Sequence, residues 1–176
     1  MIDALHLRRS TSPAVPAACA LAVAVGAFAR FGASSHALGV AFICSVLVAI
    51  AAIDIEQHRI PNVIVLPASV VVLLGQTLHS PSRAASFLGY GLGAAGALLV
   101  LALLYPKGLG MGDVKLALLL GLALGSGVVL ALAIGFVVAA GFSVMLLVLA
   151  HSHTRKTAIP LAPFLALGTL AVLLIQ

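Results

Sequence analysis

The fold class is decided by residues 116–150, LALLLGLALGSGVVLALAIGFVVAAGFSVMLLVLA, a run of 35 residues without a charged side chain. As a single α-helix this run would be roughly 52 Å long, against a bilayer hydrocarbon core of about 30 Å. We therefore predict a helical hairpin that crosses a membrane twice. The predicted turn is Gly125, Ser126 and Gly127, with Gly135 and Gly141 as alternatives.

The composition of the whole chain agrees with a membrane protein. Apolar residues make up 63% of the 176 residues and charged residues 7%, whereas about 25% of an ordinary soluble domain is charged. A water-soluble globular fold and a disordered chain are both excluded. The two cysteines, Cys19 and Cys44, exclude a disulfide scaffold. The net charge of +5 is spread between apolar runs, so it indicates membrane topology rather than nucleic-acid binding.

Apolar runs divide the chain into predicted membrane spans. Besides 116–150, the runs of single-span length are 13–29, 37–53, 60–78, 84–105 and 159–175. We predict an all-α, polytopic membrane protein of about seven transmembrane helices, with an N-terminal tail and first span in residues 1–29 and a six-helix core in residues 30–176. The first run has an alternative interpretation as a signal peptide, because Arg8 and Arg9 precede it and Ala27–Phe28–Ala29 ends it.

Basic residues between the runs predict the orientation. With seven spans and a cytoplasmic N-terminus, the cations on the cytoplasmic side are Arg8, Arg9, Arg59, Lys107, Lys115, Arg155 and Lys156. Arg30 and Arg83 lie on the other side. With six spans the difference would nearly vanish, so the positive-inside rule favours the hairpin.

Acidic residues are rare, and three of the four adjoin spans. The four are Asp3, Asp54, Glu56 and Asp113, and a carboxylate close to hydrocarbon is a functional hypothesis by default. Asp54 ends the second span and Asp113 begins the fifth. Since two complete crossings separate them, both are expected at the cytoplasmic edge of the membrane, where they can meet as a catalytic pair.

Each acidic residue also has a structural interpretation. An Asp after glycines at a helix start is typically an N-cap, which fits Asp113. Asp54 follows a helix whose C-terminal dipole disfavours negative charge, and it can instead pair with His58 or Arg59. Glu56 is the alternative to Asp54 as the catalytic carboxylate.

Other polar and small residues indicate architecture rather than chemistry. His58, His151 and His153 are predicted on one side of the membrane, but no acidic residue lies near the last two, so we expect no metal site and no cofactor. Four glycines in the fourth predicted span are expected to allow close helix packing; they are Gly89, Gly91, Gly93 and Gly96.

Three sequence segments together resemble the prepilin peptidases, or type IV leader peptidases, which are membrane aspartic proteases. The first is Asp54 with Ile60, Pro61 and Asn62, and the second is the run Gly110–Met111–Gly112–Asp113–Val114–Lys115. The third segment contains Ile159, Pro160, Pro163, Leu165 and Gly168. The resemblance covers residues 37–176 in outline.

The resemblance implies a function and a site. Asp54 and Asp113 would be the catalytic pair, Gly110 and Gly112 would let a backbone approach the scissile peptide, and Pro61 and Asn62 would turn the chain. The implied substrate is a prepilin or pseudopilin with a basic leader, cut at the cytoplasmic face of a bacterial inner membrane. Lys115 and Arg59 would repel that leader or bind the phosphates of membrane lipids.

One departure from the family points to its short members. Larger members carry paired CxxC motifs and also N-methylate the processed pilin, whereas the two cysteines here form no such motif. The chain is therefore similar to the peptidases of tight-adherence, or Flp-type, pilus systems, and methyltransferase activity is not expected.

Two other functional classes remain as alternatives. The first is a small multi-pass transporter or membrane scaffold, in which the acidic residues would be ion sites. The second is an intramembrane protease of the presenilin type, which also uses GxGD. That class has a Tyr before its first Asp, whereas Ile53 precedes Asp54 here.

Overall fold

The fold is given by a computed structural model that describes residues 35–106, 108–149 and 160–175. These residues form six α-helices and one 3₁₀ turn, and no strand occurs among them. The helices are α2 (Ser35–Gln57), α3 (Asn62–His79), α4 (Pro81–Leu104), α5 (Met111–Leu124), α6 (Val128–Leu149) and α7 (Ala162–Ile175), with η1 (Gly125–Gly127) between α5 and α6. The predicted first span and the boundary at residues 29–30 lie outside the described residues.

Several helices are long and apolar enough to cross a membrane. Among the described residues these stretches are Leu38–Gln57, Asn62–His79, Pro81–Leu104 and Met111–Leu146, and α7 is a shorter apolar helix. The prediction of an all-α polytopic membrane protein is confirmed. Helices α5 and α7 have 14 residues each, or about 21 Å at 1.5 Å per residue. Helix α7 is shorter than the predicted run 159–175, whereas α5 begins at Met111, before the predicted run 116–150.

The long apolar run is broken at the predicted turn. Gly125 has φ +58° and ψ −128°, a conformation that essentially only glycine adopts without strain. Val114 in α5 is buried in a cluster against which Phe136 of α6 packs. In one straight helix these two residues would lie about 33 Å apart, so the chain reverses direction at η1, as the hairpin prediction required.

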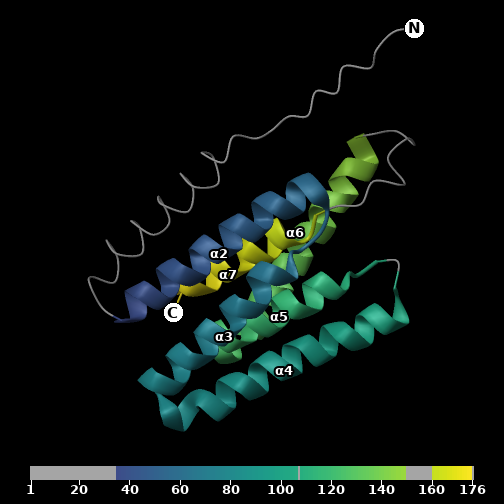
Figure 1. The fold of residues 1–176 in the computed structure, drawn as a ribbon. Coiled ribbons are helices and arrows are strands. Elements are labelled where there is room, and N and C mark those ends of the chain that lie inside the picture. Colours follow the sequence, from purple (N-terminus) through teal and green to yellow (C-terminus); the bar gives the residue numbers. More distant parts are fainter. Residues whose placement is uncertain (1–34, 107, 150–159, 176) are drawn as a thin grey trace, which may run out of the picture.

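The chain passes back and forth between two ends of the bundle. In Figure 1 the α2–α3 and α4–α5 connections lie at one end, and the α3–α4 and α5–α6 connections lie at the other. Helix α5 packs against α3 and α4, whereas α7 packs against α2 and α6. The first of these ends carries the sequence motifs.

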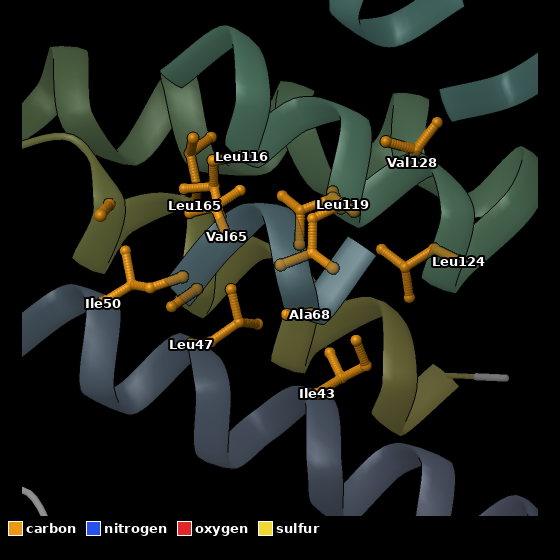
Figure 2. Close-up of a cluster of buried hydrophobic side chains, with 14 of the residues drawn as sticks. Ile43, Leu47, Ile50, Val65, Ala68, Leu116, Leu119, Leu124, Val128 and Leu165 are labelled. Atoms are coloured by element: carbon orange, nitrogen blue, oxygen red, sulfur yellow. The ribbon is translucent and has the colours of Figure 1, made fainter. Parts of the chain in front are cut away.

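The core lies where α2, α3, α5, α6 and α7 meet. Figure 2 shows its aliphatic side chains interdigitating, and the labelled residues are Ile43, Leu47, Ile50, Val65, Ala68, Leu116, Leu119, Leu124, Val128 and Leu165. Because close packing of this kind resists volume changes, the core holds the helix ends in fixed relative positions.

Glycines bring two pairs of helices into backbone contact. A Cβ on Gly121 would lie 2.5 Å from the Cα of Gly91, so α4 and α5 touch at these two glycines. A Cβ on Gly168 of α7 would collide with the carbonyl oxygen of Ala131 in α6. The predicted packing role is thus confirmed for Gly91. Within the described part of the chain, an added Cβ would meet nothing within 4 Å at Gly89, Gly93 or Gly96, so the prediction finds no support at these three.

Candidate active site

Asp54 lies in the last turn of α2 and is almost fully buried. Its side chain is 5% exposed, and α2 ends three residues later, where His58 takes the left-handed conformation with φ +51°. The Oδ2 atom of Asp54 accepts a hydrogen bond of 2.9 Å from the backbone N–H of Ala162. The predicted alternative is therefore wrong, because the partner of this carboxylate is the start of α7 rather than His58 or Arg59.

Glu56, the alternative catalytic carboxylate, is exposed. Two residues along a helix turn the side-chain direction by about 200°, so Glu56 and Asp54 point to different sides of α2. The buried position is the one that Asp54 occupies.

Asp113 is the third residue of α5 and is half-buried. Gly110 is the N-cap residue, and its backbone N–H donates to Oδ2 of Asp113 over 3.1 Å. The expectation of a capping role is correct in part: Asp113 stabilises the helix start, but from the N3 position rather than from the N-cap. This is one half of a capping box, since Gly110 has no side chain to accept a bond in return.

The two aspartates are brought together although α3 and α4 separate them in the chain. The connection that follows Asp54 packs through Ile60 against Gly112, next to Asp113, so both carboxyl groups lie at the same end of the bundle. Each uses one oxygen to accept a backbone N–H. The arrangement is a pair of carboxyl groups at one end of the bundle, each held by the backbone of a helix start.

The two segments that carry the aspartates also touch each other. A Cβ on Gly112 would lie 2.8 Å from Cβ of Ile60, so the α5 backbone packs directly against that side chain. Nearby, Lys115 donates from Nζ to Oδ1 of Asn62 over 2.9 Å. These contacts join the connection between α2 and α3 to the start of α5.

Pro61 and Asn62 lie at the start of α3, where the chain returns after α2. Pro61 is the N-cap residue with φ −74° and ψ 119°, and its carbonyl oxygen accepts the N–H groups of Ile64 and Val65. Proline lacks a backbone N–H, and this is tolerated here because an N–H at the start of a helix has no intrahelical partner. The pair sets the direction in which the chain returns from Asp54.

Ala162, whose N–H binds Asp54, was not among the predicted site residues. The signal was present in the third motif, since Pro160 and Pro163 flank the start of α7. Prolines mark a helix start, but they do not say which distant side chain meets it.

Metal ligation finds no support in the described part of the chain. No group of three or more His, Cys, Asp or Glu side chains is placed there to hold a metal ion. His151 and His153 lie outside the described residues.

Comparison with known proteins agrees with the motifs. The profile of the type IV leader peptidase family matches residues 41–151. Two relatives named prepilin leader peptidase/N-methyltransferase, from Burkholderia pseudomallei strains 1026b and K96243, are each 32% identical over 161 residues. The matches cover 86% of this chain and 51% of each relative, so the chain spans about half the length of the curated relatives it matches. No solved structure matches. The resemblance read from the three motifs is confirmed, and the chain belongs to the type IV leader peptidase family.

Proposed function

We propose that this protein is an aspartic endopeptidase that removes the basic leader from prepilins or pseudopilins. The observation that carries the proposal is the placement of Asp54 and Asp113 at one end of the bundle, on segments joined by the contact between Ile60 and Gly112. Family membership supplies the reaction class, and the names of the two relatives supply the substrate class.

The chemistry follows from two carboxyl groups that share one site. Two like charges cannot both form easily at close range, so one carboxyl group holds a proton and polarises the scissile carbonyl. The other is ionised and takes a proton from water, which attacks the carbonyl carbon. The tetrahedral intermediate collapses when the leaving amine gains a proton, and no covalent intermediate with the enzyme forms.

The backbone bonds assign the atoms in this scheme. Oδ2 of each aspartate accepts a backbone N–H, so we assign the second oxygen of each carboxyl group to water and substrate. The half-buried position of Asp113 gives water a route to the pair.

We further infer that the site faces the cytoplasm and that the substrates are Flp-type prepilins. The first inference is supported by the excess of cations on the predicted inner side, where the leader of a prepilin waits before cleavage. The second rests on the resemblance to short family members, and the proposal covers leader removal without N-methylation.

Co-expression with Flp-type prepilins tests the proposal. Leader removal is followed on a gel for the wild type, Asp54→Asn and Asp113→Asn at equal membrane levels, with Glu56→Gln as the matched control. We expect both Asp variants to lose cleavage and the Glu variant to keep it. Mass spectrometry of the mature pilin then reports whether its N-terminus is methylated.

Each other outcome removes a defined part of the proposal. Cleavage by an Asp variant overturns the catalytic pair, and loss of cleavage in Glu56→Gln alone moves the role to that residue. If the wild type cuts no candidate, the Flp-type assignment is wrong.

A further inference from the structure

We propose that the start of α7 is a positioning element of the active site, in which the backbone N–H of Ala162 fixes the orientation of Asp54. The inference rests on the proposed function, because it assigns Asp54 to the catalytic pair. It adds a third segment of the chain to the two motifs that supply the aspartates.

The first observation is the position of Asp54 on its own helix. Asp54 lies in the last turn of α2, where the negative end of the helix dipole disfavours a carboxylate. Its side chain is also 5% exposed, so water does little to stabilise the charge. A buried carboxylate in this position requires another source of stabilisation.

The start of α7 supplies that stabilisation. Helix N-termini carry unpaired N–H groups and the positive end of the dipole, and the N–H of Ala162 donates to Asp54 over 2.9 Å. The bond joins residues 108 positions apart in the sequence. The negative end of the α2 dipole disfavours the carboxylate of Asp54, and the positive end of the α7 dipole offsets this effect.

The second observation is that α7 has only one first-turn donor for Asp54. The N–H groups of Phe164 and Leu165 both donate to the carbonyl oxygen of Leu161, and Pro163 has no N–H. Only the N–H of Ala162 therefore points away from the helix's own carbonyls. A single donor holds one oxygen of Asp54 and leaves the other for the reaction.

Substitution at Asp54 tests the contact itself. Asn keeps a side-chain oxygen that can accept the N–H of Ala162, whereas Ala has none. We expect purified Asp54→Asn to melt close to the wild type and Asp54→Ala to melt several degrees lower. Equal melting temperatures for the two variants would mean that the contact contributes nothing and would overturn the proposal.

Removal of one N–H group tests positioning. Incorporation of L-lactic acid at residue 162 by nonsense suppression replaces the amide with an ester, which keeps the methyl side chain and deletes the N–H donor. The ester also weakens the carbonyl of Leu161 as an acceptor for Phe164 and Leu165, so a control at that bond is needed. The matched control is phenyllactic acid at residue 164, which deletes a donor of the same helix end that bonds to Leu161 rather than to Asp54.

The readout is steady-state cleavage of a purified prepilin in detergent. We expect the ester at 162 to lower kcat roughly tenfold or more with KM unchanged, and the ester at 164 to lower the melting temperature with kcat unchanged. An unchanged kcat for the 162 ester, while Asp54→Asn is inactive, refutes the positioning role and leaves the proposed function standing. Cleavage by Asp54→Asn overturns the proposed function and the positioning role together.

Discussion

Gly112 is where the α5 segment approaches the connection between α2 and α3. An added Cβ would lie 2.8 Å from Cβ of Ile60, an atom fixed to the backbone that cannot swing away. Small residues at such contacts allow the close approach of two backbones, and this one determines the distance between the segments that carry Asp54 and Asp113.

Gly112→Ala is expected to destabilise the protein and reduce cleavage. Overpacking of this kind costs about 1–3 kcal/mol of unfolding free energy, and the shift moves one aspartate relative to the other. Thermal unfolding by circular dichroism and prepilin cleavage measure the two effects.

The control for Gly112→Ala is Gly110→Ala in the same motif. A Cβ at Gly110 would lie 3.4 Å from Oδ2 of Asp113, an ordinary contact, and the φ of −84° and ψ of 152° suit any residue. Equal losses of stability in both variants would contradict the packing argument.

Lys115 and Asn62 are expected to act as one unit. The hydrogen bond from Nζ to Oδ1 is exposed, so its worth is at the low end of about 0.5–1.5 kcal/mol. We expect Lys115→Met, Asn62→Ala and the double variant to lose similar amounts of unfolding free energy, whereas Lys115→Arg keeps a donor and loses less. Additive losses in the double-mutant cycle would show that the two side chains act separately.

At the scale of elements, helices α5 and α7 are shorter than the hydrocarbon core of a bilayer is thick. Each is about 21 Å long, so at least one end of each lies within a hydrocarbon core of about 30 Å unless the bilayer thins. Backbone groups there need partners from the protein. Asp113 and Asp54 accept the N–H groups of Gly110 and Ala162, so each aspartate also provides a partner for one N–H group at a helix start.

The turn between α5 and α6 depends on one glycine. Gly125→Ala is expected to cost roughly 1–3 kcal/mol, because φ +58° with ψ −128° is strained for any other residue and the new Cβ would lie 2.8 Å from the ring of Phe87. Denaturant or thermal unfolding in detergent measures the loss.

Gly141→Ala in α6 is the matched control for the turn. An added Cβ there would meet nothing within 4 Å, and Ala is favoured over Gly in a helix interior by about 0.5–1 kcal/mol. A Gly125 variant as stable as the Gly141 variant would mean that the hairpin tolerates other turn conformations.

At the scale of the whole molecule, the orientation in the membrane is testable with cysteines. In a background without Cys19 and Cys44, Arg59→Cys lies between α2 and α3 and Ser82→Cys lies in the first turn of α4, and both positions are exposed. A membrane-impermeant maleimide is expected to label residue 82 in intact cells and residue 59 only after the membrane is opened. The reverse pattern would place the motif end outside the cytoplasm.

The helices and the general location of the site could be predicted from the sequence because the bilayer imposes their length. Runs without charges defined the spans, and Gly125–Gly127 defined the turn. Counting crossings then placed Asp54 and Asp113 at one end. This inference needs only the number of crossings between two residues, not the details of packing.

The contacts between helices that complete the site could not be predicted from the sequence. Interior and lipid-facing side chains are equally apolar, so the pattern of the helices does not show which faces meet. The bond from Ala162 to Asp54 and the bond from Lys115 to Asn62 depend on how α7 and α5 pack. For the same reason the sequence could not distinguish Gly91 from the three other glycines of α4. Within the described residues, Gly91 is the one of the four that contacts a neighbouring backbone.

The link between Asp54 and Ala162 also sets an order of events during synthesis. The chain grows by about 5–20 residues per second, so Asp54 leaves the ribosome roughly 5 to 20 seconds before the amide that it will meet. Under the proposed function, the active site of the nascent peptidase is incomplete while the helices between Asp54 and Ala162 are being inserted. The active site is complete only after α7 has been synthesised and inserted, because the amide of Ala162 belongs to that helix.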